Sequence, residues 1–74
     1  MSKVISMTSN HLSKNLILIR TEFGFSQVKV AELLNMKRST YAGWEEGRNE
    51  PSIDTLIEIS KLYSITLDQL IKPL

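Results

Sequence analysis

Apolar residues recur at helical spacing where the regular part of this chain begins. Leu12, Leu16 and Ile19 lie at positions i, i+4 and i+7, so they share one face of a helix. Gly24 follows this stretch, and glycine readily adopts the left-handed conformation that commonly ends a helix. The pattern therefore predicts a first helix over about Leu12–Phe23.

Two short helices with a tight turn between them are predicted next. Ser26 is a good N-cap for a second helix, whose apolar residues begin at Val30. Asn35 tolerates the left-handed conformation better than most residues, so we expect the chain to turn sharply there. A third helix is expected over residues 37–46, with Gly47 placed to end it.

Two further helices complete the pattern. Ser52 is placed to cap a fourth helix that turns Leu56 and Ile59 inward. Thr66 and Gln69 form a capping-box pattern at the start of a short fifth helix. With five helices and no strand pattern, the sequence predicts an all-α fold, a compact five-helix bundle.

The size of the chain limits the functions available to it. Residues 1–10 show no sustained period and predict an N-terminal arm before one folded domain at residues 11–74. A chain of 74 residues with 42% hydrophobic content forms one small core but is too small to enclose a deep active site. It has no cysteine, and one histidine, His11, cannot form a metal site alone. We therefore expect no metal, no cofactor and a cytoplasmic protein.

Charge is unevenly distributed, although the net charge is only +1. Residues 1–48 carry seven basic and four acidic side chains, a balance of +3, whereas residues 49–74 carry two basic and four acidic ones, a balance of −2. The first of these segments is therefore better suited to contact phosphate. No apolar run approaches the roughly 20 residues needed to cross a bilayer, so we expect no membrane partner.

The third predicted helix is the candidate for contact with a DNA major groove. A helix with its side chains is about 10–12 Å across and the groove is about 12 Å wide, so an exposed helix on a small body fits it. Tyr41 and Trp44, at positions i and i+3, are assigned to the core rather than to stacking on bases. The outward positions that remain predict base contacts from Arg38, Ser39, Ala42 and Gly43.

These residues differ in what they offer to a base. Arg38 can donate two hydrogen bonds to guanine O6 and N7, Ser39 can pair with several bases, and Ala42 can touch a thymine methyl group. Gly43 offers a close approach of the backbone, and it weakens the helix by about 1 kcal/mol unless packing compensates. Contacts to phosphate are predicted from Gln27 at the start of the second helix and from three residues on or next to the third: Lys37, Thr40 and Arg48.

Several residues in a fixed order resemble the Cro/cI-type helix-turn-helix family, also known as the XRE or lambda-repressor-like family. The matching positions are Ser26-Gln27, Ala31, Leu34, Ser39-Thr40, Trp44-Glu45, Gly47, Pro51-Ser52 and Leu56. The resemblance covers residues 12–71 and implies a lambda-repressor-like bundle containing a helix-turn-helix. It also implies a transcription regulator, expected to be a repressor, that binds double-stranded operator DNA as a homodimer with helix 37–46 in the major groove.

The resemblance implies one structural ion pair, between Arg20 and Glu45, that bridges the first and third helices. Three positions depart from the family pattern. Lys37 stands where many relatives have a Ser or Thr cap, and Ser64 stands where glycine is common. Gly43 stands where relatives often have a long polar side chain, which weakens the expectation of strong base specificity.

The sequence also bears on functions other than operator binding. Ile17 and Leu18 lie outside the main apolar stripe of the first helix. We expect them to be covered by the N-terminal arm, by the last helix or by a partner subunit. A protein-interaction or antitoxin-like adaptor module of the same fold is the alternative function. An enzyme is not expected, because no nucleophile with a base, paired carboxylates or glycine-rich phosphate loop can be assembled. If these residues are the whole protein, it has no sensor domain, and no small-molecule ligand is expected.

Overall fold

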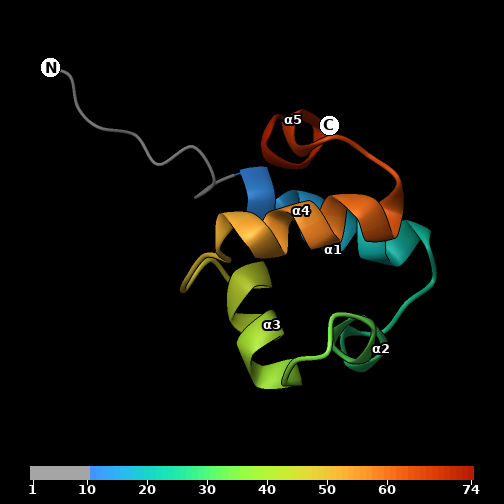
Figure 1. Cartoon of the computed structure of the whole chain (residues 1–74), viewed down its shortest axis with the longest axis vertical. Helices are drawn as coiled ribbons and strands as arrows, with labels where there is room; N and C mark the ends of the chain where they lie inside the picture. Colours follow the sequence, from blue (N-terminus) through green and yellow to red (C-terminus); the bar gives the residue numbers. More distant parts are fainter. Residues whose placement is uncertain (1–10) are drawn as a thin grey trace, which may run out of the picture.

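The computed structural model describes residues 11–74, which form five α-helices and contain no strand (Figure 1). The helices are α1 (His11–Glu22), α2 (Gln27–Leu33), α3 (Arg38–Glu45), α4 (Ile53–Tyr63) and α5 (Leu67–Ile71). The predicted all-α fold is therefore confirmed. The predicted arm, residues 1–10, lies outside the described residues.

Short polar side chains fix the starts of three helices. The Ser26 hydroxyl accepts a hydrogen bond from the backbone N–H of Lys29 at 3.0 Å, and Ser52 caps α4 in the same way. At α5, the Thr66 hydroxyl accepts from the Gln69 N–H while the Gln69 side chain accepts from the Thr66 N–H, which completes a capping box. The backbone N–H groups in the first turn of a helix have no acceptor within the helix, and these side chains accept hydrogen bonds from them. All three predicted starts are confirmed.

Four residues with positive φ follow the first four helices. Gly24 and Gly47 have φ of 76° and 75°, as expected for residues that end helices. Asn35, in the turn after α2, has φ of 58°, so the predicted turn is confirmed. Ser64 has φ of 57° and ends α4, although this conformation costs a residue with a Cβ about 1–2 kcal/mol.

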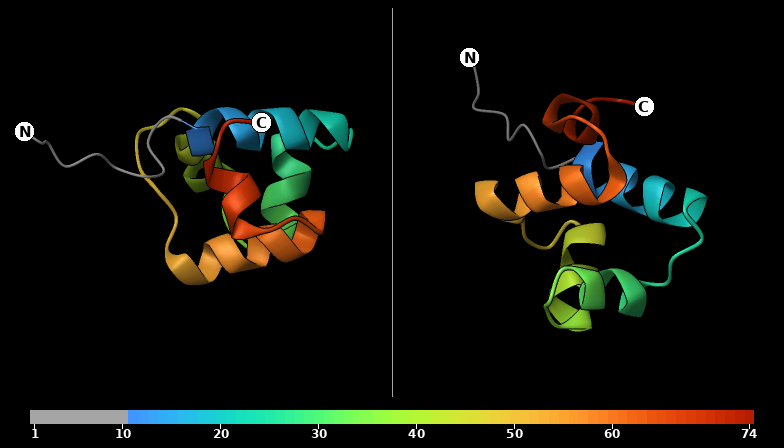
Figure 2. Two further views of the ribbon diagram at one scale, coloured as in Figure 1. Left: turned by 90° about the horizontal axis from the view of Figure 1, so that it is seen from above. Right: turned by 45° about the vertical axis from the view of Figure 1, so that its right-hand side comes forward.

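The helices enclose one cluster of buried side chains. α1 and α4 run across the middle of the molecule on separate sides, with α5 at one end of the space between them and α2 and α3 at the other (Figures 1 and 2). The cluster draws on every helix: Leu12, Leu16, Val30, Ala31, Tyr41, Trp44, Leu56, Ile59, Tyr63 and Leu70. Within residues 11–74, each helix is too short or too polar to cross a bilayer.

Asn15 ties the last helix to the first. It is buried on the inner side of α1, and its Nδ2 group lies 2.7 Å from the carbonyl oxygens of both Leu70 and Lys72 and 3.3 Å from that of Gln69. Carbonyl groups at the end of a helix have no partner within the helix. Asn15 therefore supplies the C-terminal cap of α5, a role that the sequence analysis did not identify.

Candidate nucleic-acid interface

The turn between α2 and α3 positions the candidate interface. It spans residues 34–37, and its backbone is closed by hydrogen bonds from Asn35 N–H to the Glu32 carbonyl at 3.0 Å and from Met36 N–H to the Ala31 carbonyl at 2.9 Å. α3 then packs against both α1 and α2. Lys37 is the N-cap of α3, and its side chain makes no capping hydrogen bond. The first backbone donors of α3 are therefore left without a side-chain cap.

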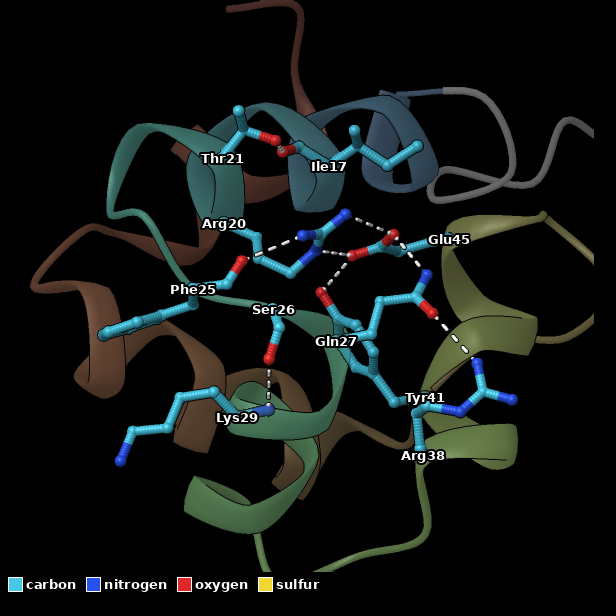
Figure 3. Close-up of polar contacts among 10 residues, drawn as sticks. All are labelled: Ile17, Arg20, Thr21, Phe25, Ser26, Gln27, Lys29, Arg38, Tyr41 and Glu45. Carbon is cyan, nitrogen blue, oxygen red and sulfur yellow. Dashed lines mark hydrogen bonds and ion pairs between the residues drawn. The ribbon is translucent and has the colours of Figure 1, made fainter.

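Glu45, the last residue of α3, is the centre of a buried polar network (Figure 3). Arg20 from α1 donates to both carboxylate oxygens, from Nε at 2.6 Å and from Nη2 at 3.2 Å. The Tyr41 hydroxyl donates to Glu45 at 2.5 Å and the Gln27 side-chain amide donates at 2.9 Å. The structure thus contains the Arg20–Glu45 ion pair. Because the Glu45 side chain is only 3% exposed, its charge depends on these donors in place of water.

The same network fixes the loop between α1 and α2. Arg20 Nη1 donates to the backbone carbonyl of Phe25 at 2.9 Å, in addition to the bonds to Glu45 (Figure 3). One guanidinium group therefore joins α1, the following loop and α3. This arrangement sets the position of α2, which begins two residues after Phe25.

The network keeps both partners of the ion pair charged. Burial raises the pKa of Glu45, but the hydrogen bonds from Arg20, Tyr41 and Gln27 outweigh burial, so the pKa of this carboxyl lies below its usual value. The hydrogen bond to Glu45 raises the pKa of Arg20. Burial, followed by the hydrogen bond to Glu45, raises the pKa of Tyr41, which remains a protonated donor.

Gln27 connects this buried network to the surface. Its Nε2 donates to Glu45, while its Oε1 accepts a hydrogen bond from Nη1 of Arg38 at 3.1 Å. A carboxylate only accepts and a guanidinium only donates, so this amide has one workable orientation. Figure 3 shows Arg38 lying beside Gln27 at the start of α3. The structure therefore brings these two predicted contact residues together.

The first turn of α3 is the part of the helix that faces solvent. Lys37, Arg38, Ser39 and Thr40 are all exposed, as the predicted contact with DNA requires. Arg38 uses one guanidinium nitrogen for Gln27. A guanidinium group has five N–H donors, so Arg38 has others with which to donate to an acceptor outside the protein.

The prediction that Ala42 and Gly43 lie on the outer face of α3 is wrong. Ala42 is 4% exposed and Gly43 is buried as well. The reason is the loop after α3, which folds back over the helix. A Cβ atom at Gly43 would lie 2.9 Å from Asn49 Oδ1 and 3.5 Å from both terminal nitrogens of Arg48. The loop therefore covers position 43, and Ala42 and Gly43 do not form an exposed face of α3.

Arg48 lies on this loop rather than on the first turn of α3. Its side chain is exposed and its Nε pairs with Glu46 Oε1 at 2.7 Å. An exposed pair of this kind contributes no more than about 1 kcal/mol, so Arg48 can exchange Glu46 for another anion at little cost. Among the four predicted phosphate contacts, Lys37, Thr40 and Arg48 are thus exposed, and Gln27 is partly buried in the network.

The chain is similar to known helix-turn-helix proteins. A family model described as helix-turn-helix matches residues 16–70. The HTH-type transcriptional activator BcrR of Enterococcus faecalis is 36% identical over 53 residues, which is 72% of this chain and 26% of BcrR. The HTH-type transcriptional regulator ImmR of Bacillus subtilis (strain 168) is 33% identical over 60 residues, 81% of this chain and 47% of ImmR. The chain thus spans about a quarter to a half of the length of these relatives.

Solved structures with the same arrangement of helices include a transcriptional regulator and a DNA-binding domain. A transcriptional regulator from Listeria innocua superposes with a TM-score of 0.77 and 30% identity, over 81% of this chain and 56% of that one. The BldD DNA-binding domain of S. venezulae superposes with a TM-score of 0.75 and 25% identity, over 90% of this chain and 100% of that domain. The whole of a domain described as DNA-binding therefore has its counterpart here.

Proposed function

Because this chain belongs to the XRE-type helix-turn-helix family of transcription regulators, we propose that it binds operator DNA through the first turn of α3. The observation that carries the proposal is the placement of Arg38. It is exposed at the start of α3 and is held there by Gln27, which in turn is bonded to the buried Glu45. An arginine held in this way has a defined position before it meets DNA, which lowers the entropic cost of binding.

Base contacts are assigned to two residues. Arg38 has guanidinium N–H groups left to donate to guanine O6 and N7, and such a contact contributes about 1–3 kcal/mol of discrimination against a wrong base. Ser39, exposed beside it, can donate to or accept from several bases. The burial of residues 41–45 supports direct contact with base edges through this one turn of the helix.

Phosphate contacts are assigned to residues around the turn. Lys37 and Thr40 are exposed on either side of the base-contacting pair, and Arg48 is exposed on the loop that covers α3. The Nε2 group of Gln27 carries two hydrogens. One is donated to Glu45, and the other can be donated to a phosphate oxygen. These contacts would set the position of the protein on DNA without selecting its sequence.

The expected mechanism is steric. A dimer would place two α3 helices in successive major grooves on one face of the duplex, about 34 Å apart, at a palindromic site. Such a dimer would act as a repressor by blocking access of the polymerase to the occupied DNA. We infer no catalytic step, since regulators of this family act by binding.

The test is a selection of bound sites from random duplex DNA, followed by titration of the best site at two salt concentrations. We expect a palindromic consensus with half-sites about one helical turn apart. Arg38→Ala should lose about 1–3 kcal/mol of binding free energy at this site and relax the preference at one base pair. The matched control is Lys61→Ala, which removes an exposed positive charge from α4 and should leave affinity unchanged.

Two outcomes would contradict the proposal. One is weak binding by the unmodified chain that is blind to sequence and disappears with a modest rise in salt. The other is an Arg38→Ala variant that selects the same consensus with the same affinity, which would exclude Arg38 from base recognition.

A further inference from the structure

One face of α1 is left uncovered by the rest of residues 11–74. Leu18 is 52% exposed, and Phe23 and Leu74, which line the same groove, are 50% and 64% exposed. The groove has a volume of about 350 Å³ and is lined by Leu18, Ile19, Glu22, Phe23, Ile65 and Leu74. It is large enough to receive an apolar side chain, and clustered apolar exposure of this kind marks contact surfaces.

The charges along this face are arranged in a self-complementary order. Lys14, Leu18 and Glu22 lie at positions i, i+4 and i+8, so they form one ridge along α1 with a basic end, an apolar middle and an acidic end. Each charge is about 6 Å from Leu18 along the helix axis. Within the described part of the chain, neither Lys14 nor Glu22 belongs to an ion pair.

We propose that this ridge and the groove beside it form the surface through which two copies of the chain pair. When two α1 helices cross in antiparallel orientation at Leu18, Lys14 of each copy lies opposite Glu22 of the other. Leu18 of each copy then enters the groove of the other. The contact is isologous, because the same patch serves both subunits. A parallel crossing would bring like charges together and is disfavoured.

This pairing is compatible with the DNA-binding surface. α5 and the C-terminus lie at one end of the molecule and the first turn of α3 lies at the other, so the turn stays exposed in both copies (Figure 1). The pairing supplies a surface for the dimer of the proposed function and rests on that function for its biological role. Its existence is tested without DNA, so failure of the pairing and failure of operator binding are distinguishable.

The experiment is sedimentation of the full chain without DNA, from about 1 μM to about 1 mM, a range that covers weak association. The apparent mass should rise from 8.4 kDa towards twice that value. Lys14→Glu and Glu22→Lys should each weaken self-association at least about tenfold, because each gives a ridge with one kind of charge. An equimolar mixture of the two variants should associate again, because the acidic ridge of one then faces the basic ridge of the other.

A matched substitution on α2 serves as the control for one on the ridge. Leu18→Glu should abolish self-association, whereas Leu33→Glu, which alters a similarly exposed leucine on α2, should not. Circular dichroism of each variant checks that the fold is intact, as expected for exposed positions. The proposal is overturned if the unmodified chain stays monomeric throughout the range. It is also overturned if the single charge variants associate as the unmodified chain does, or if their mixture fails to associate.

Discussion

The two halves of α3 differ in what surrounds them. The first turn, with the N-cap Lys37, faces solvent, whereas the five residues Tyr41–Glu45 are all buried. In a helix with 3.6 residues per turn, five successive buried positions mean that this segment is enclosed on every side. α1 and α2 pack against it, and the loop containing Arg48 and Asn49 covers Gly43. The C-terminal half of α3 is therefore fixed by its neighbours, and the N-terminal turn is exposed to solvent.

This difference indicates how a domain of this size can hold a contact surface rigid. A single exposed turn has too few contacts to fix its own orientation, so the orientation has to come from the buried half. The Glu45 network provides it, because it joins α3 to α1, α2 and the loop between them. Stability and recognition are thereby assigned to different residues of one helix, and substitutions can separate them.

The largest effect is expected from Glu45→Ala. It leaves Arg20 without its charged partner and removes the acceptor for Tyr41 and Gln27, so we expect unfolding to become easier by about 3–5 kcal/mol. Thermal melts followed by circular dichroism measure this change. Glu46→Ala is the control, because this neighbouring carboxylate forms only an exposed pair with Arg48 and should cost less than about 1 kcal/mol. Equal losses for both variants would mean that the buried half does not anchor α3.

The second effect is on the pH dependence of stability. The pKa of Glu45 is lowered by folding from its ordinary value of 4.5, so protonation favours the unfolded chain. The stabilisation is complete above about pH 4.5 and is lost as the pH falls through the folded-state pKa. Denaturant unfolding at a series of pH values should therefore show a flatter acid limb in Glu45→Gln, by up to about 1.4 kcal/mol per pH unit. Glu46→Gln should keep the original slope, and a Glu45→Gln curve parallel to it would count against the assignment.

A smaller effect is expected from Gln27→Ala, which removes the link between the two halves. It deletes one hydrogen bond to Glu45 and releases Arg38, so stability should fall by about 1 kcal/mol. Operator affinity should also fall, and the preference at the base pair contacted by Arg38 should become less strict. Melting curves and a repeat of the site selection measure the two changes. Unchanged selectivity in this variant would show that Arg38 needs no support from Gln27.

The smallest effect is expected from Gly43→Ala. The new methyl group would press on the end of the flexible Asn49 side chain, which can move, while alanine favours the helix by about 1 kcal/mol over glycine. The free energy of unfolding should therefore change by less than about 1 kcal/mol, and the selected operator should be the same. A change of consensus in this variant would place position 43 at the DNA after all.

The helices were predictable because their ends depend on local chemistry. Three helices are capped through hydrogen bonds that span three residues, by Ser26, Ser52 and Thr66. The turn after α2 depends on the positive φ of one residue, Asn35. Such signals are present in the sequence whatever the rest of the chain does. The starts of α2, α4 and α5 consequently follow from the sequence, and the predicted bounds of α1 and α3 lie within one residue of the observed ones.

The surroundings of α3 were less predictable because they depend on contacts between distant segments. Periodicity assigns one face of a helix to the core, but it cannot show that the Arg48–Asn49 loop covers the opposite face at Gly43. Asn15 was missed for the same reason, since its partners are 54–57 positions away in the sequence. The available signal was a polar residue three positions after Leu12, within the inward stripe of α1.

Asn15 also determines how the far end of the molecule opens. A helix of five residues is too short to persist alone, so α5 keeps its form through the burial of Leu70, the capping box at one end and Asn15 at the other. We therefore expect amide hydrogens of α5 to exchange with solvent in a local opening that leaves α2 and α3 intact, at a free energy to which the Asn15 hydrogen bonds and the burial of Leu70 both contribute. Each such opening would displace the C-terminal residues from the α1 groove. The equilibrium between the closed and open forms of α5 would then limit the fraction of molecules able to pair at any moment.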